Sequence, residues 1–236
     1  MSGLAGPTGL RGPKVCLVAM PLMARSGVYR STYDLVASAR ADGHDWTAVV
    51  GVRPDAAGAA PADAEGVREL PVTSHGRAVL DEVGDVLRTT PEVQQADHVI
   101  TLITQSDVAM ARTRRSVAAR WTCWVRGLPW PDSGEQTFLR RQLLRRVETS
   151  ALRKADDVWA TTPILAGQVA SAREAAIVPA GVPAAAAGGW DDPARPETTP
   201  RVEPPAGSGA LPRNVDALRA ALRLDDIRDA PPRPPA

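Results

Sequence analysis

The stretch KVCLVAMPLMARSGVYRSTYDLVASARADGHDWTAVVGV, residues 14–52, decides the fold that we expect for this chain. Its first apolar run, residues 15–20, has no polar alternation, which is typical of a strand buried on both faces of a parallel sheet. Apolar residues then recur at helical spacing over 28–39, Gly43 follows as a left-handed cap, and residues 44–50 give a second strand. The stretch therefore predicts a βαβ unit whose ligands bind at the carboxyl end of its first strand.

The loop between this strand and helix is the first candidate site. Pro21 is expected to end the strand, and Ser26 and Gly27 come directly before the helix. A glycine at a helix N-terminus lets backbone amides approach a phosphate, and Arg30 can add a charge-assisted contact. The alternative is that Gly27 only relieves crowding in the turn. No G-x-G-x-x-G is present, so the fingerprint of dinucleotide-binding sites is absent.

The composition excludes several classes of function. The 236 residues carry 28 basic and 27 acidic side chains, a net charge of +1, which gives no argument for a nucleic-acid partner. The two cysteines, Cys16 and Cys123, lie in apolar runs and are expected to be reduced, buried thiols of a cytoplasmic protein. The pattern contains no set of metal ligands, no cofactor motif and no apolar segment of the ~18–20 residues that a membrane span needs.

Strands and helices alternate through the rest of the chain, which predicts an α/β fold with a single Rossmann-like, doubly wound, mainly parallel sheet of about six or seven strands. Ser106 is expected to cap the helix that follows the third buried strand. Further strands are predicted near 67–72, 97–103, 121–125, 157–161 and 176–178, and further helices over 75–88, 106–118, 135–154 and 164–172.

A second loop, residues 126–131, combines one arginine, one glycine, two prolines and one tryptophan at the end of a predicted strand. Arg126 can hold an anion there, Gly127 leaves room beside it, and Trp130 can stack on a sugar or a lipid-like acceptor. The alternative is that Trp130 packs the turn onto the core.

The predicted helix 135–154 is amphipathic. We expect its charged side to be exposed to solvent without a binding role, because its apolar side is needed to cover the sheet. The alternative is that the charged side makes peripheral contact with an anionic membrane. The side expected to be buried comprises Phe138, Leu139, Leu143, Leu144, Val147, Ala151 and Leu152, and the outer side carries Arg140, Arg141, Arg145, Arg146, Arg153 and Lys154.

The pattern divides the chain into a flexible N-terminus (1–13), a Rossmann-like domain (14–183) and a Pro/Ala-rich tail (184–236). The tail holds 10 of the 22 prolines and no apolar clusters, so we expect it to be disordered apart from a vestigial helix near 214–224.

Four segments resemble the N-terminal, acceptor-side domain of family 4 glycosyltransferases, enzymes of the two-domain GT-B architecture. They are Ser26-Gly27 with the helix ending in ADGHD at 41–45, VRGLPW at 125–130, Glu148 with ALRKADDV at 151–158, and IVPAGVP at 177–183. The resemblance implies retaining transfer of a sugar from a nucleotide-sugar to a small-molecule or glycolipid acceptor. It also implies that Gly27 approaches the donor diphosphate, while Arg126 and Trp130 line the acceptor side.

This sequence departs from that family at several positions, and these departures change the function that we expect. Ser26 replaces one of two glycines, and Arg126 stands where many members have histidine, so no catalytic residue is assigned. The segment RVEPPAGSG at 201–209 interrupts the strand and loop that would open a donor-binding domain. We therefore expect an acceptor-side domain, truncated before the donor-binding domain and inactive by itself. The alternative is a non-catalytic partner subunit that completes a site with a separate donor-domain chain, using an exposed apolar surface at the carboxyl edge of the sheet.

Overall fold

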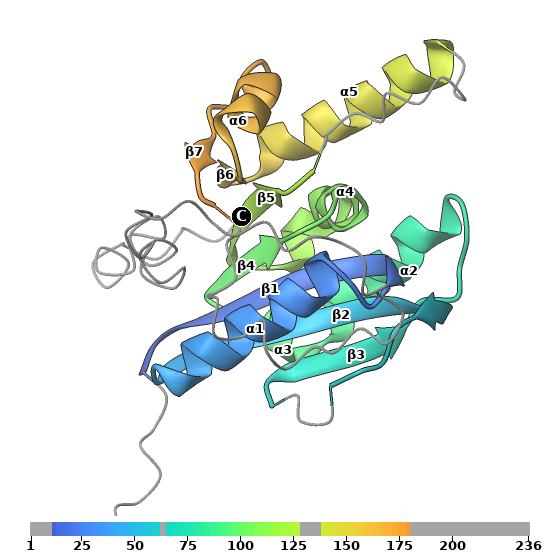
Figure 1. The fold of residues 1–236 in the computed structure, drawn as a ribbon. Helices are drawn as coiled ribbons and strands as arrows, with labels where there is room; N and C mark the ends of the chain where they lie inside the picture. The colour runs from blue at the N-terminus through green and yellow to red at the C-terminus, as the bar shows by residue number, and fades with distance from the viewer. Residues whose placement is uncertain (1–10, 62–64, 128–137, 180–236) are drawn as a thin grey trace, which may run out of the picture.

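The computed structural model describes residues 11–61, 65–127 and 138–179, and within these ranges one sheet organises the molecule (Figure 1). Its seven strands are all parallel and lie in the order β3-β2-β1-β4-β5-β6-β7. The predicted α/β fold with a parallel sheet of six or seven strands is confirmed. The strands are β1 (Arg11–Ala24), β2 (His44–Ala57), β3 (Val67–Pro71), β4 (His98–Thr101), β5 (Arg120–Val125), β6 (Asp157–Ala160) and β7 (Ala176–Ile177).

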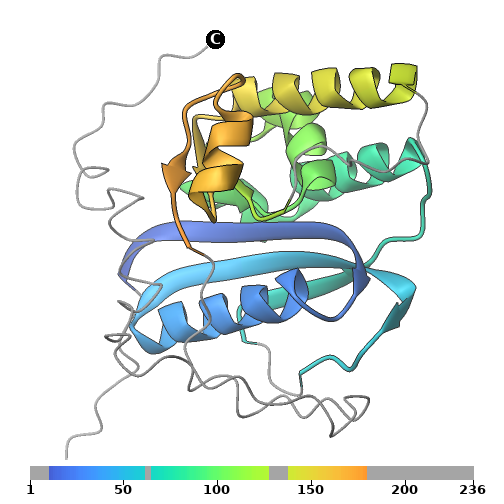
Figure 2. The ribbon, with the colours of Figure 1, turned by 45° about the horizontal axis from the view of Figure 1, so that its top comes forward.

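The helices cover the two faces of the sheet unequally. Figure 2 shows α1 along the β1–β2 side of one face, and α4 and α5 lie beyond the other. The helices are α1 (Val28–Ala41), α2 (Ala78–Thr89), α3 (Pro91–Gln94), α4 (Thr104–Thr113), α5 (Phe138–Lys154) and α6 (Pro163–Val169), with a 3₁₀ turn, η1 (Arg114–Ser116). Residues 1–10 of the predicted flexible N-terminus (1–13) and the predicted tail 184–236 lie outside the described residues. Residues 11–13 were predicted to be flexible, but they belong to β1 because the strand begins at Arg11 and pairs there with His44 of β2.

Each face of the sheet has its own apolar core, which explains the uninterrupted apolar run of β1. Because strand side chains alternate, Val15 and Leu17 pack in the core on the α1 side. Cys16 and Val18 pack in the core beneath α2, α4, α5 and α6. All four side chains are completely buried, and both cysteines are free thiols, as predicted.

The direction in which the chain winds through the sheet reverses between β1 and β4. At this point β1 extends further at its carboxyl end than predicted. Pro21 does not end the strand: β1 continues to Ala24 and still pairs with β2, with a register shift between Ala19 and Leu22. Proline cannot donate to the ladder, so the strand absorbs it as an irregularity instead of ending. The extension carries the β1–α1 loop beyond the end of β4.

Ser106 corrects a second prediction. It is not the cap of α4, since Ile103 occupies that position, and it lies buried in the first turn. Its Oγ accepts a hydrogen bond from the Met20 N–H (3.1 Å) and donates one to the Met20 carbonyl (2.8 Å). Because β4 ends at Thr101, opposite Val18, Met20 has no strand partner on that side, and Ser106 satisfies both of its backbone groups.

Helix α5 departs from its predicted burial. Ala151 and Leu152 are buried, but Leu139 and Leu143 are 79% and 56% exposed. Figure 1 shows the N-terminal half of α5 extending past the ends of β5 and β6, the strands next to it, which is why these leucines cover no strand. The side chain of Phe138 lies outside what the structure describes. Among the described residues, no helix has the length and apolar character to cross a bilayer.

Candidate functional site

A cavity of about 260 Å³ opens at the carboxyl edge of the sheet, beside the point where the winding reverses. In doubly wound folds this is where ligands bind, because the helices on either side of the reversal diverge and leave a crevice. Its lining comes from α1, the start of α4, the end of β5 and α5, and comprises Val28, Leu102, Ile103, Thr104, Gln105, Asp107, Trp124, Val125, Arg126, Gly127, Glu148 and Leu152.

Arg126 and Gly127, both predicted from the second loop, line this cavity. Arg126 stacks over Trp124, with its Cζ 5.1 Å from the ring centroid. Its Nη1 is buried and has no hydrogen-bond partner among the described residues. Burial lowers the pKa of Arg126 to about 10, so the guanidinium is still charged at neutral pH. A buried cation with an unmatched donor is suited to holding an anionic or strongly polar group of a ligand. Trp130 lies outside the described residues.

Two carboxyl groups in the cavity, Asp107 and Glu148, were not among the predicted site residues. Asp107 accepts a hydrogen bond from the Thr101 hydroxyl, and burial raises its pKa to about 7. Burial, and secondly the neighbouring Asp107, raise the pKa of Glu148 to about 8. The Oε2 of Glu148 is buried and has no hydrogen-bond partner among the described residues. Near pH 7 this pair can both donate hydrogen bonds to, and accept them from, a hydroxylated ligand.

The predicted loop residues Ser26, Gly27 and Arg30 are not part of the lining; from this loop and the helix after it, only Val28 reaches the cavity. Gly27 has φ +49°, a conformation that other residues rarely adopt, and a Cβ built on it would meet nothing within 4 Å. Crowding is therefore not the reason for the glycine. The backbone conformation requires it, and the space above it is open.

A polar cluster that sequence reasoning missed holds this loop in place. Arg25 donates to Glu69 on β3 (2.7 Å) and to the carbonyl of Ala56 (3.0 Å), and Tyr29 donates to the same carboxylate (2.6 Å). Burial acts to raise the pKa of Glu69, but the hydrogen bonds from Arg25 and Tyr29 outweigh it and lower the pKa. Arg25 is thus neutralised within the fold, although it lies beside the glycine that was expected to meet a phosphate.

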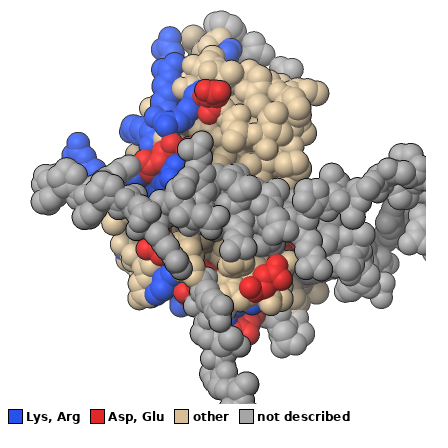
Figure 3. Space-filling model, turned by 90° about the vertical axis from the view of Figure 1, so that its left-hand side faces the viewer, with Lys and Arg blue, Asp and Glu red and all other residues tan. Residues whose placement is uncertain are grey.

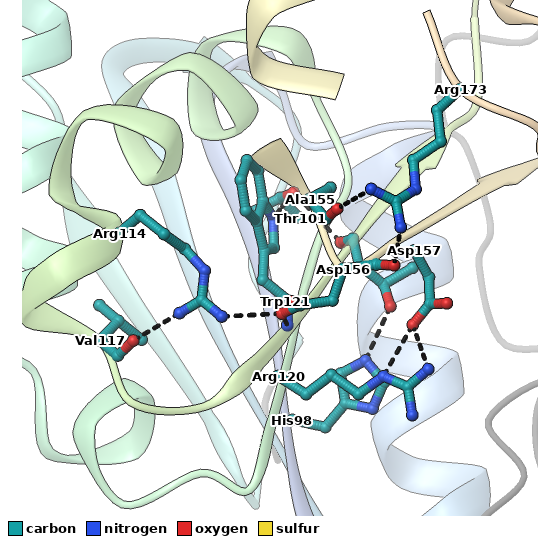
Figure 4. A network of polar contacts seen from close by, with 11 residues as sticks. His98, Thr101, Arg114, Val117, Arg120, Trp121, Ala155, Asp156, Asp157 and Arg173 are labelled. Carbon is teal, nitrogen blue, oxygen red and sulfur yellow. Dashed lines mark hydrogen bonds and ion pairs between the residues drawn. The ribbon is translucent and has the colours of Figure 1, made fainter. Parts of the chain in front are cut away.

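The acidic pair within the segment 151–158 has a structural role at the opposite, amino edge of the sheet (Figure 4). Asp156 accepts hydrogen bonds from Arg114 (2.7 Å) and from the Trp121 N–H (2.8 Å), and Asp157 pairs with Arg120 (2.7 Å). These contacts join the α5–β6 turn to the start of β5. These two aspartates of the resembling segment therefore stabilise the fold, whereas Leu152 of the same segment lines the cavity.

Three buried titratable side chains of the central strands, Cys16, His98 and Cys123, are held in their neutral forms. Burial raises the pKa of Cys16 to about 12 and that of Cys123 well above its ordinary value, so neither is a ready nucleophile. Burial, and secondly Arg120, lower the pKa of His98 to about 3, and its Nε2 lies 2.7 Å from the Thr122 hydroxyl. Among the described residues, no three His, Cys, Asp or Glu side chains form a group that could hold a metal ion.

Comparison with known proteins gave matches among solved structures only. No model of a known protein family matches the chain, and no curated protein matches it. The chain is similar to HepE from Anabaena, solved with UDP and glucose (13% identity over 71% of this chain and 44% of that chain, TM-score 0.46). It is also similar to sucrose-phosphate synthase from Thermosynechococcus elongatus (15% identity, 71% and 48%, TM-score 0.49). A third similar structure is an alpha-glucosyltransferase in complex with UDP and DNA (11% identity, 71% and 42%, TM-score 0.43). The chain spans less than half the length of each of these proteins.

Proposed function

We propose that this chain is a glycosyltransferase-type protein whose described domain supplies the acceptor side of a sugar-transfer site. One observation carries the proposal: segments of the resembling motifs, far apart in sequence, lie around one cavity. Val28 follows Ser26-Gly27, Arg126 and Gly127 belong to the second loop, and Glu148 opens the third segment. The fourth segment adjoins the site, because the Val178 carbonyl accepts a hydrogen bond from Trp124 (3.1 Å).

The chemistry of the cavity suits a hydroxylated acceptor. Glu148 offers an unmatched oxygen to an acceptor hydroxyl, and Arg126 offers an unmatched donor to a ring oxygen, hydroxyl or anionic substituent. The apolar walls, including Val28, Trp124 and Leu152, can pack against the less polar face of a sugar ring. Sugar transfer also needs groups that neutralise a leaving diphosphate, and in this proposal they come from outside the described residues.

The test is ligand-observed saturation-transfer NMR on the full chain, with methyl and octyl glucosides and mannosides as acceptor probes and UDP-glucose as the donor probe. We expect saturation to reach the sugar protons of at least one glycoside, and Arg126→Ala to weaken that binding at least tenfold. The exposed Arg77→Ala is the matched control. If saturation instead reaches the uracil protons of UDP-glucose, and this signal disappears in Arg126→Ala, the cavity is a donor site.

A second candidate function, a partner subunit, is favoured by one observation. Among the described residues, large apolar side chains are exposed at the carboxyl edge at Met23 at the end of β1 (72%), Ile164 at the start of α6 (73%) and Ile177 at the end of β7 (53%). Exposed apolar residues at the edge that bears the cavity are suited to contact another chain. If none of the glycosides binds, this second function becomes the favoured one.

A further inference from the structure

The outward stripe of α5 has an unusual composition. Leu139, Leu143, Arg146, Ser150 and Arg153 follow one another at the i, i+4, i+7, i+11, i+14 spacing of a single helical face, and all five are exposed. The stripe is apolar toward the projecting end of the helix and basic toward the body. An ordinary solvated face was expected because the leucines were needed to cover the sheet. Since they do not, that reason no longer holds for this half of the helix.

Positive charge is concentrated on the same helix. The sequence of α5 contains five arginines, one lysine and a single acidic residue, Glu148, which faces the cavity, whereas the whole chain has a net charge of +1. Figure 3 shows Lys and Arg side chains gathered along one edge of the upper half of the molecule, the half that contains α5 and α6 in Figure 1. A shallow hollow of about 460 Å³ lies along this helix, and its lining includes Arg145, Arg146, Arg153, Thr149, Ser150 and Ser171.

We propose that this stripe docks the chain on a bilayer surface that carries anionic phospholipids. A helix at the boundary of headgroups and acyl chains buries apolar side chains and keeps basic ones at the phosphates, and the two ends of this stripe meet those two requirements. The arginines and hydroxyls of the hollow are donors that match phosphate oxygens. A nucleic acid would use the arginines but leave Leu139 and Leu143 in water, so the lipid surface is favoured.

Docking by this stripe has a consequence for the cavity. Glu148 and Leu152 line the cavity from the opposite side of the same helix, so the cavity would lie one helix diameter from the lipid headgroups. The inference rests on α5 alone and does not depend on the proposed function.

The test is vesicle co-sedimentation of the full chain at 0.1 M salt, with phosphatidylcholine vesicles and with an equal mixture of phosphatidylcholine and phosphatidylglycerol. We expect binding to the mixed vesicles only, weakened at least tenfold by Arg146→Gln with Arg153→Gln, and at least fivefold by Leu139→Ser with Leu143→Ser. The matched controls are Arg77→Gln, at the N-cap of α2, with Arg88→Gln in its last turn, and the exposed Ile164→Ser on α6. These variants should leave binding unchanged.

A fluorescent label gives a reading that does not depend on affinity. Both native cysteines are buried, so an environment-sensitive fluorophore can be attached selectively to Leu143→Cys, with Ile164→Cys as the control. A blue shift on adding mixed vesicles is expected at position 143 and not at 164. The proposal is overturned by absence of sedimentation with anionic vesicles, by sedimentation that neither α5 double variant reduces, or by a label at 143 that stays in water. Binding of the chain to duplex RNA that displaces the vesicles would assign the arginines to a nucleic acid instead.

Discussion

Glu148 and Arg126 lie in the same cavity, and each has a buried polar atom without a hydrogen-bond partner among the described residues. A buried polar atom without a partner costs free energy unless a water or a ligand supplies the missing hydrogen bond, and both of these residues line a cavity that can admit one. Asp107 is a second carboxyl group in this cavity, and after burial it is the next cause of the raised pKa of Glu148. At the scale of the residue, these three side chains define what the cavity can bind.

The raised pKa of Glu148 predicts a dependence of stability on pH. Between about pH 4.5 and 8 the folded protein holds a proton that the unfolded chain releases, so this group makes the free energy of unfolding fall as pH rises. Relative to wild type, Glu148→Gln should therefore gain about 1–2 kcal/mol between pH 5 and pH 8, a figure reduced for the partial exposure of the carboxyl.

Urea unfolding of both proteins at pH 5, 6, 7 and 8 measures this difference, and the exposed Glu174→Gln is the control. Parallel stability curves for wild type and Glu148→Gln would mean that the carboxyl titrates normally and is solvated.

At the scale of the element, the carboxyl edge depends on contacts between neighbouring segments. The β1–α1 loop is held to β3 by Arg25, Tyr29 and Glu69, and the start of α4 is held to β1 by Ser106. The Ser106 bonds replace the ladder pairing that β1 loses where β4 ends. The site is thus assembled from loop and helix starts that are fixed by side chains instead of by strand pairing.

Ser106→Ala tests this arrangement. The variant leaves both the N–H and the carbonyl of Met20 buried without their partner, and we expect the free energy of unfolding to fall by about 1–3 kcal/mol. Chemical denaturation measures the loss, and Ser116→Ala, at an exposed position in η1, should change stability by less than about 0.5 kcal/mol. A loss no greater than that of the control would mean that water replaces the hydroxyl at no cost.

At the scale of the whole molecule, His98 predicts that the free energy of unfolding falls in acid. Its folded pKa of about 3 lies below the ordinary value of 6.5, so between those values the unfolded chain binds a proton that the folded protein does not. Stability from this group is complete above pH 6.5 and is lost as pH falls, by about 2 kcal/mol from pH 7 to pH 5. Asp107 and Glu148 act in the opposite direction in that range, so the comparison must be with a variant.

His98→Gln removes the titrating ring and retains a group that can bond the Thr122 hydroxyl. Guanidinium unfolding at pH 5 and 7 should show a smaller loss of stability in acid for the variant than for wild type. Equal losses in the two proteins would show that the ring becomes protonated without unfolding.

Much of the fold could be predicted from local patterns. Residues 15–20, without alternation, indicated a strand buried on both faces, and both faces of β1 are buried. Predictions failed where one element had to be placed against another. Ser106 has the sequence of a cap but bonds β1, and Leu139 and Leu143 have the spacing of a buried face but project beyond the sheet. Of the predicted site residues, Arg126 and Gly127 line the cavity, whereas Ser26, Gly27 and Arg30 do not.

The sequence by itself determined the order and type of the strands and of the longer helices, because a period of 3.6 or an uninterrupted apolar run indicates locally how many faces of an element are buried. The short α3 and η1 have no such period and were not predicted. Only the tertiary structure decided that Asp107, Arg126 and Glu148 share one cavity and that half of α5 has no sheet beneath it. Local periodicity indicates which side chains are suited to burial. Which surface covers it depends on where the chain brings distant elements together, and for Leu139 and Leu143 no part of the sheet lies there.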